Sequence, residues 1–239
     1  MKAIAIDSAV SKLTISAKND EFSVSTIFDI GMKQSETLLP AIDYVLSKLN
    51  ITTDDLDYLV LSKGPGSFTG LRIGSATAKG LGLALSIPII PVPTVDALAY
   101  NLYGSDKLIC PIMDARRNQV YTGLYEFQKG EENDSVYRMN TIEKQCAVDI
   151  AQIVEMINSL GKEAIFLGDG VAVYQEKIAE LIKVPYSFAP ACCNRQRAAC
   201  VASLGAVLYA QGILETAAEH APDYLRPSQA ERERAEKGM

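Results

Sequence analysis

A glycine-rich segment has the residue types and spacing that could bind a phosphate. Gly64-Pro-Gly-Ser-Phe-Thr-Gly70 follows the run Asp57 to Leu61, which predicts a strand, and precedes small residues that predict a helix. Unpartnered amides and the positive end of the helix dipole attract anions at a helix start, so Gly64, Gly66 and Ser67 could face a phosphate. The spacing differs from a Walker A loop and from the dinucleotide fingerprint. The alternative that these glycines let the helix pack closely on its strand therefore stays open.

Acidic residues follow two further predicted strands. Asp7-Ser8 ends the first predicted strand, and Asp114 ends the strand that opens the second half of the chain. Ligands of α/β sheets bind at the carboxyl ends of strands, so each Asp could hold a magnesium-bound water, or it could cap a turn. Gly168-Asp169-Gly170 is a common tripeptide that could face a nucleotide across a cleft. The residues that could face a nucleotide or phosphate are Asp7, Ser8, Gly64, Gly66, Ser67, Gly168, Asp169 and Gly170.

The charge and the histidine content exclude several classes of protein. The chain has 239 residues, a formal net charge of −6 and one histidine, His220. An acidic chain disfavours a self-sufficient nucleic-acid binder, which needs clustered Lys and Arg to neutralise phosphates. A single histidine excludes any site that needs two, and no Ser-His-Asp or Cys-His set can be drawn. The sequence therefore assigns no catalytic residue and no metal ligand.

The cysteines and the apolar runs indicate the compartment. Cys110, Cys146, Cys192, Cys193 and Cys200 are odd in number and show neither CxxC nor zinc spacing. The adjacent Cys192-Cys193 could be a redox pair, but ordinary buried thiols in a reduced cytosol are the expected interpretation. No apolar run approaches the roughly 18 residues of a membrane span, and Asp7 interrupts the apolar start too early for a secretory signal. We expect a cytoplasmic protein with no membrane partner.

The hydrophobic pattern predicts the same order of elements twice. Three short strands, a helix, a strand, a glycine turn and a second helix are expected between residues 2 and 85, and again between residues 108 and 182. This order predicts two α/β lobes with mixed sheets, related by a pseudo-twofold axis. The expected domains are an N-terminal lobe (1–104), a second lobe (105–193), a C-terminal helix that returns to the first lobe (194–227) and a disordered polar tail (228–239).

Two helices of the first lobe could belong to its core or could bind another subunit. Gln34 to Leu49 has apolar residues at helical spacing, and Phe68 to Leu85 has glycines and alanines that would let a second helix approach closely. Spacing alone does not separate these interpretations. The residues proposed for a partner interface are Leu38, Leu39, Ile42, Leu46, Leu71, Gly74, Ala78 and Leu81.

The residues from Gly64 to Gly74, with Ala78-Lys-Gly80, resemble the signature of the bacterial TsaB (YeaZ) family. The resemblance covers nearly the whole chain except the tail. Its further segments are Ile4-Ala-Ile-Asp7-Ser8, Ser35-Glu36 with Leu38-Leu-Pro40, Asp114-Ala-Arg-Arg117 with Val120-Tyr121, Gly168-Asp-Gly170 and Pro222-Asp-Tyr-Leu-Arg226. One departure is Gln34, which stands where members often carry His before the Ser-Glu pair.

The resemblance implies the fold shared by actin, the sugar kinases and the heat-shock ATPases. It implies an accessory, non-catalytic subunit needed for threonylcarbamoylation of the adenosine next to the anticodon in tRNA. The implied partners are a TsaD homologue, which this chain would activate as a heterodimer through the two helices above, and a TsaE-type ATPase. The chain would reach tRNA only through the complex, and alone it could form a homodimer. No cofactor is implied for this chain, whereas ATP or ADP with magnesium could act at the level of the complex.

An alternative of a different class is a stand-alone nucleotide-binding ATPase or kinase of the same fold. Asp7 and Asp114 would then surround magnesium, and the loops at Gly64 and Gly168 would hold phosphates. The catalytic sister subunit of the family is implied to hold its metal with a pair of histidines, which a chain with one histidine lacks. A metal-free peptidase, sometimes proposed for the family, ranks last because no nucleophile–base pair is evident. The accessory interpretation is therefore preferred.

Overall fold

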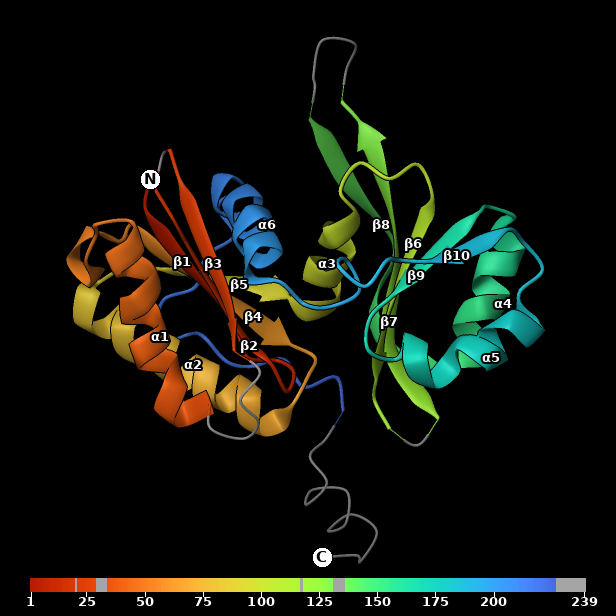
Figure 1. Ribbon diagram of the computed structural model, residues 1–239, viewed down its shortest axis with the longest axis horizontal. Helices are drawn as coiled ribbons and strands as arrows, with labels where there is room; N and C mark the ends of the chain where they lie inside the picture. The colour runs from red at the N-terminus through yellow and green to blue at the C-terminus, as the bar shows by residue number, and fades with distance from the viewer. Residues whose placement is uncertain (20, 29–33, 117, 131–135, 227–239) are drawn as a thin grey trace, which may run out of the picture. The chain divides into compact units, whose positions relative to one another are not determined.

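The computed structural model describes residues 1–19, 21–28, 34–116, 118–130 and 136–226. The chain divides into two compact units, Met1–Thr94 with Val201–Met239, and Val95–Cys200. Over the described residues, each unit contains one five-stranded sheet with helices packed against it (Figure 1). Each unit is described by itself below.

The first unit contains a mixed sheet in the order β3-β2-β1-β4-β5. Its strands are β1 (Ala3–Asp7), β2 (Leu13–Lys18), β3 (Ser23–Phe28), β4 (Tyr58–Gly64) and β5 (Ile89–Pro93). β1 is antiparallel to β2, with Asp7 opposite Thr14, and parallel to β4, with Ile6 opposite Leu61. β1 is buried along its whole length because helices cover both faces of the sheet, whereas the edge strand β3 alternates between exposed and half-buried residues.

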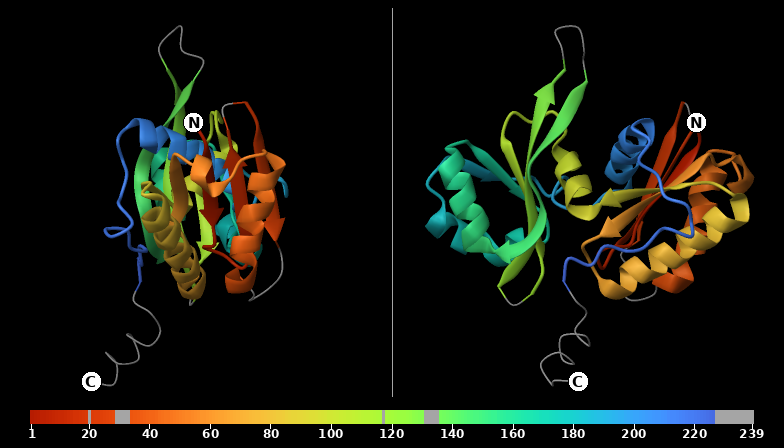
Figure 2. Two further views of the ribbon diagram at one scale, coloured as in Figure 1. Left: turned by 90° about the vertical axis from the view of Figure 1, so that its left-hand side faces the viewer. Right: turned by 180° about the vertical axis from the view of Figure 1, so that it is seen from behind.

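Helices α1 (Gln34–Lys48) and α2 (Phe68–Leu85) cover one face of this sheet, and α6 (Ala198–Ala210) lies on the other (Figures 1 and 2). A short 3₁₀ helix, η1 (Thr53–Asp55), precedes β4. Alternate residues of β4 serve the two faces, because strand side chains alternate in direction. Leu59 and Leu61 belong to the core beneath α1 and α2, while the Tyr58 ring stacks on Tyr209 of α6 with centroids 4.4 Å apart. None of the described helices is long and apolar enough to cross a membrane.

The second unit repeats this topology. Its elements are α3 (Thr94–Ala99, whose first residue belongs to the first unit), η2 (Tyr100–Leu102), β6 (Leu108–Asp114), β7 (Gln119–Lys129), β8 (Tyr137–Asp149), α4 (Ile150–Leu160), β9 (Ala164–Leu167), α5 (Val171–Leu181) and β10 (Tyr186–Phe188). The sheet order β8-β7-β6-β9-β10 matches that of the first unit strand by strand, and β6 is antiparallel to β7 and parallel to β9. The prediction of an α/β fold with duplicated mixed sheets is therefore confirmed.

The boundaries of the units differ from those expected from the sequence. The sequence predicts residues 95–104 in the first lobe, but they belong to the second unit. The reason is contact with β7: the Tyr125 hydroxyl donates to Asp96 at 2.6 Å, and the Tyr103 ring packs edge-on against Phe127. Residues 194–200 also belong to the second unit. Helix α6 spans Ala198–Ala210 and is therefore shorter than the helix expected over 194–214. Strand β10 was not expected, and the predicted tail at 228–239 lies outside the described residues.

Candidate functional site

The glycine-rich segment forms the turn from β4 to α2, as its composition predicts. Ser67 is the N-cap of α2, and its Oγ accepts the Gly70 N–H at 3.3 Å. The Ser67 N–H in turn donates to the carbonyl of Ala9 at 2.6 Å. The segment is thus held against the residues that follow β1, so Asp7, Ser8 and the segment lie together in the first unit.

The glycines of this segment face the protein's own backbone. A Cβ on Gly66 would lie 2.3 Å from the Ala9 carbonyl oxygen, and a Cβ on Gly70 would lie 2.1 Å from that of Ser8. A Cβ on Gly64, whose φ is +125°, would lie 2.2 Å from the Asp223 carbonyl oxygen. The space on the Cβ side of these glycines is therefore filled by residues of the same unit. Of the two interpretations left open by spacing, close packing is the one that this geometry favours.

Asp7 is completely buried at the end of β1. Its Oδ1 accepts the Ala9 N–H at 3.0 Å, while its Oδ2 has no hydrogen-bond partner among the described residues. The hydroxyl of Thr14, opposite Asp7, is likewise buried without a partner there, and the Ser62 hydroxyl is buried beside the Asp7 carboxyl group. Burial raises the pKa of Asp7 to about 6, and the Ala9 N–H and the Ser62 hydroxyl oppose that shift.

These residues do not fit an open site for magnesium and a nucleotide. Magnesium prefers an octahedral shell of oxygen ligands that usually includes waters and substrate phosphates. Asp7 is the only acid of its buried cluster, and within the described chain no group of three or more His, Cys, Asp or Glu residues could hold a metal. The Ser8 hydroxyl is also engaged, because it donates to the Gly70 carbonyl at 2.8 Å. We therefore derive no chemical step through magnesium in this unit.

The turn at Gly168 occupies the equivalent place in the second unit, between β9 and α5. Gly168 has a φ of +113°, and a Cβ there would lie 2.1 Å from the Ile112 carbonyl oxygen. The Gly168 N–H donates to Asn194 Oδ1 at 2.5 Å. The Asp114 N–H donates to Asp169 Oδ1 at 3.4 Å, and burial raises the pKa of Asp169. Asp114 and Gly168 to Gly170 are thus brought together within one unit.

Most of the residues proposed for a partner interface lie in the core of the first unit. Those buried there are Leu38, Ile42, Leu46, Leu71, Gly74 and Ala78. Leu81 is half-buried and packs against the same core, whereas Leu39 is 53% exposed. The physical reason is that an amphipathic helix directs its apolar stripe towards its own sheet. These buried side chains therefore pack in the core of their own unit and do not form an exposed interface.

Other residues of α1 and α2 form an exposed apolar surface. We call Leu39, Tyr44, Ala76, Gly80 and Leu83 the α1–α2 outer face, since all five are exposed on the two helices. Leu83 is 66% exposed and Tyr44 is 50% exposed. The sequence indicates this surface through Ala76, Gly80 and Leu83, which recur at helical spacing next to the buried residues of α2.

A C-terminal strap (residues 215–226) is a further feature that the sequence did not predict. Glu215 forms an isolated antiparallel bridge with Ile89, and the Asp223 N–H donates to the Lys63 carbonyl at 2.8 Å. The Tyr224 ring lies 5.0 Å from that of Phe68 at the start of α2. The strap therefore covers the glycine turn of the first unit.

The single histidine holds this strap in place. His220 Nδ1 lies 2.8 Å from Glu215 Oε2, and the other carboxylate oxygen of Glu215 accepts from Lys63 Nζ at 2.5 Å. Lys79 donates to the His220 carbonyl at 2.8 Å. Burial lowers the pKa of His220, and Glu215 opposes that shift. Lys63 of β4 and Lys79 of α2 thus join the strap to the unit, and the His220 side chain supports this network by its contact with Glu215.

Comparison with known proteins identifies relatives of this chain. Residues 31–234 match the family model described as "TsaD: tRNA N6-adenosine threonylcarbamoyltransferase". The tRNA threonylcarbamoyladenosine biosynthesis protein TsaB of Bacillus subtilis is 33% identical over 97% of this chain and 96% of its own length. TsaB of Escherichia coli is 29% identical over 61% of this chain and 66% of its own length. The fold is shared with YeaZ from Pseudomonas aeruginosa, with a TM-score of 0.79 at 21% identity over 93% of this chain and 99% of that one.

Proposed function

We propose that this chain, which belongs to the TsaB family, is an accessory subunit in the biosynthesis of threonylcarbamoyladenosine in tRNA. The observation that carries the proposal is the 33% identity to Bacillus subtilis TsaB over nearly the full length of both chains. In this proposal the chain works in the cytoplasm and activates a TsaD homologue, with a TsaE-type ATPase as a further partner. Its net charge of −6 supports an indirect contact with tRNA through the complex.

The α1–α2 outer face is the surface that we propose for the TsaD homologue. Contiguous exposed apolar residues mark interaction sites on soluble proteins. Ala76 and Gly80 are small, so a partner helix can approach the α2 backbone closely, while Leu39 and Leu83 can enter pockets on the partner. In the absence of the TsaD homologue, the same face would pair with a second copy of this chain.

The geometry of the first unit supports an accessory role over catalysis by this chain. Asp7 is buried, and Ser8 and the glycines of the turn are packed against one another. His220, the single histidine, is buried within the strap and hydrogen-bonded to Glu215. These residues are therefore engaged in contacts within the fold, which supports a non-catalytic role.

Reconstitution tests the proposed function. Purified TsaD and TsaE homologues from the same organism are supplied with tRNA, ATP, magnesium and the threonylcarbamoyl donor, with and without this chain. We expect modification of tRNA only when this chain is present, and no ATP hydrolysis by the isolated chain. Equal modification without it would contradict the accessory role, and magnesium-dependent turnover by the isolated chain would favour the ATPase alternative.

Substitution on the outer face tests the proposed interface. Leu83→Glu should weaken binding to the TsaD homologue by about a hundredfold or more, because an unpaired charge buried in an interface costs several kcal/mol and about 1.4 kcal/mol is tenfold. Val207→Glu is the matched control, since Val207 is also an exposed apolar residue of this unit, on α6. Binding is measured by titration calorimetry and folding by circular dichroism. Unchanged binding by a folded Leu83→Glu variant would place the partner elsewhere.

A further inference from the structure

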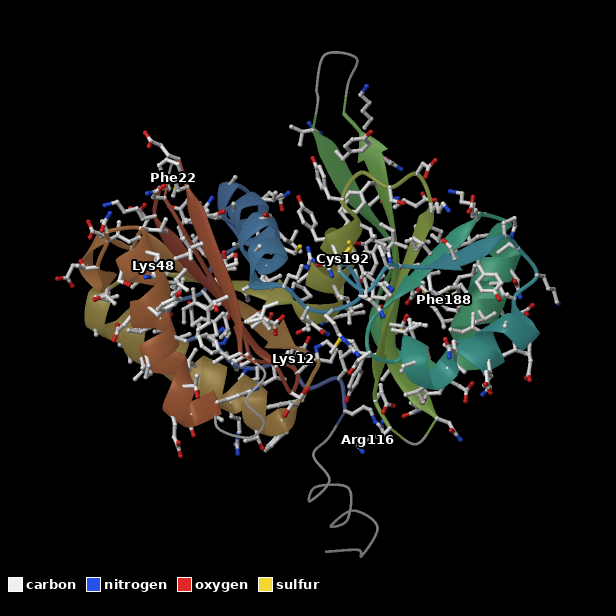
Figure 3. The ribbon with its side chains drawn as sticks, in the orientation of Figure 1. Lys12, Phe22, Lys48, Arg116, Phe188 and Cys192 are labelled. Carbon is white, nitrogen blue, oxygen red and sulfur yellow. The ribbon has the colours of Figure 1, made fainter. Side chains whose placement is uncertain are left out.

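Two adjacent cysteines lie close together in the loop that follows β10. The Sγ atoms of Cys192 and Cys193 are 3.7 Å apart. Cys192, labelled in Figure 3, is exposed, and Cys193 is half-buried, which corrects the sequence-based expectation that both are ordinary buried thiols. Two thiols at van der Waals distance, one of them open to solvent, have the arrangement of a peroxide-sensitive pair.

The backbone of this loop is anchored on both sides of the pair. The Cys193 N–H donates to the Pro190 carbonyl at 2.8 Å. The side-chain amide of Asn101 donates to the carbonyls of Cys193 and Arg195, at 2.8 and 2.7 Å. The loop is therefore ordered by contacts within the second unit, and the short distance between the two sulfur atoms follows from that order.

The other cysteines of this unit are less suited to react. Cys110 is buried, and burial raises the pKa of its thiol to about 12. Burial also raises the pKa of the Cys200 thiol to about 11, and it raises the pKa of the Cys146 thiol and of the half-buried Cys193 thiol. The thiolate is the reacting species, so Cys110 and Cys200 resist oxidation near neutral pH, and Cys193 is suited to react second, after Cys192. Among the cysteines of the described residues, Cys192 alone is exposed.

We propose that Cys192 and Cys193 are a reversible oxidation site that hydroperoxides convert into a vicinal disulfide. The Cys192 thiolate attacks one oxygen of the peroxide, the O–O bond breaks, and a sulfenic acid forms on Cys192 with release of hydroxide, or of an alkoxide from an organic peroxide. The sulfur of Cys193 then attacks the Cys192 sulfur, the S–O bond breaks, and hydroxide leaves with the Cys193 proton as water. Two thiols are oxidised by two electrons, and one peroxide is reduced.

The adjacency of the two residues makes such a disulfide easy to reduce. Successive Cα atoms are about 3.8 Å apart across a trans peptide, whereas disulfide-bonded residues usually have Cα atoms about 4.4–6.8 Å apart. Strained and exposed disulfides have higher reduction potentials and are the labile ones. A cellular dithiol reductant would therefore restore the pair, which makes the modification a switch rather than a permanent crosslink.

The oxidation site is connected directly to the Gly168 turn. Asn194, which follows Cys193, accepts the Gly168 N–H through its side chain. Closing a ring between Cys192 and Cys193 must rotate the torsions of Cys193 and so displace Asn194. The oxidised form should release the Gly168 amide, because its acceptor moves away.

Peptide mapping of the full chain tests the proposal directly. Trypsin places Cys192 and Cys193 on one peptide, residues 184–195, which contains no other cysteine. The protein is treated with hydrogen peroxide, alkylated without reduction and digested. We expect this peptide to escape alkylation and to be lighter than the reduced, unalkylated peptide by two hydrogen atoms, with recovery after dithiothreitol. Amide exchange at Gly168 should increase at least tenfold in the oxidised protein.

Single substitutions separate the possible outcomes. Cys192→Ser should abolish the mass shift, Cys193→Ser should stop at a sulfenic acid that dimedone traps, and Cys200→Ser should leave the shift unchanged. Two alkylated thiols on the peptide after peroxide treatment, or a crosslink to the peptide that carries Cys200, would overturn the proposed pair. Formation of the disulfide with no change in exchange at Gly168 would overturn its connection to the turn.

Discussion

The two units have the same strand order, but they close their glycine turns in different ways. In the first unit, backbone carbonyls of Ser8, Ala9 and Asp223 fill the space beside the glycines. In the second unit, the Ile112 carbonyl fills that space and the side chain of Asn194 accepts the turn's amide. The first turn is thus closed by two backbone segments, Ser8-Ala9 and the one around Asp223, whereas the second depends partly on one side chain next to the adjacent thiols. Two turns at equivalent places of a duplicated topology are therefore closed by different groups, one by backbone alone and the other partly by a side chain.

The helices that follow the turns differ as well. α2 has 18 residues, and the exposed residues Ala76, Gly80 and Leu83 run along its outer side. α5 has 11 residues, and its buried positions are Val171, Tyr174 and Ile178. The longer helix of the first unit carries part of the surface that we propose for a partner. The turn at Gly64 to Gly70 and the proposed partner surface therefore belong to the first unit, whereas the thiol pair belongs to the second.

The largest effect is expected where the first turn is most tightly packed. Gly70→Ala places a Cβ 2.1 Å from the Ser8 carbonyl oxygen, so it should reduce the free energy of unfolding by about 3 kcal/mol or more. Gly80→Ala on the same helix meets nothing within 4 Å and should raise it by about 0.5–1 kcal/mol. Urea unfolding followed by circular dichroism measures both. Similar changes in the free energy of unfolding for the two substitutions would contradict the tight packing at Gly70.

The second effect concerns the buried carboxyl group beside the first turn. The pKa of Asp7 is about 6 in the folded protein, against 3.8 for an unperturbed Asp, so ionised Asp7 destabilises the fold above pH 6. One pKa unit is about 1.4 kcal/mol, so Asp7→Asn should raise the free energy of unfolding at about pH 7.5 by roughly 1–3 kcal/mol. The gain should shrink as the pH falls through 6 towards 3.8, because wild-type Asp7 then becomes protonated.

Thermal unfolding of wild type and variant at about pH 7.5 and about pH 4.5 checks this prediction. The matched control is Asp114→Asn, at the equivalent strand end of the second unit, where the side chain is half-buried and accepts the Arg116 N–H at 2.9 Å. This control should change stability by less than about 0.5 kcal/mol. An Asp7→Asn variant that is less stable than wild type at neutral pH would show that the Asp7 charge is compensated.

The third prediction concerns the hydrogen bond from the Gly168 N–H to the Asn194 side chain in the second turn. Asn194→Ala removes the acceptor of the Gly168 N–H and should reduce the free energy of unfolding by about 1–2 kcal/mol. Amide exchange at Gly168 should accelerate, while exchange at Gly70 in the other unit should stay as in wild type. Unchanged protection at Gly168 would mean that the Ile112 contact alone closes this turn.

The smallest effect is expected at the strap. The Tyr224 and Phe68 rings are both partly exposed, so Tyr224→Leu should reduce the free energy of unfolding by only about 0.5–1 kcal/mol. Thermal unfolding measures this loss, and Tyr44→Leu, on an exposed ring of α1, is the control that should change less. A loss of several kcal/mol at Tyr224 would show that the strap contributes far more to closing the first turn than its contacts indicate.

Local patterns predict much of this fold. Apolar periodicity places the strand Leu108–Asp114 and the helix α2 where the structure has them, because burial of one face repeats every two or about 3.6 residues. The glycines at Gly64 and Gly168 mark both turns for the same local reason. Strand β10 escapes such a pattern, since three residues are too few to show a period.

The candidate site depends on contacts that no local pattern contains. The spacing of Leu38, Ile42 and Ala78 is the same whether they face their own sheet or a partner, and only the packing of α1 and α2 on the sheet buries them. His220 is alone in the sequence, and its link to Glu215 becomes meaningful only when the strap pairs with β5.

By itself the sequence determined the order of the elements, their duplication and the family, because these depend on local periodicity and on motifs along the chain. The tertiary structure decided that the glycines of the first turn are filled by Ser8 and Ala9. It also decided that Leu83 rather than Leu38 is exposed, and that one of two adjacent thiols faces solvent. Clearance beside a Cα atom and the burial of a side chain are set by segments distant in the sequence, so they exist only once the chain has folded.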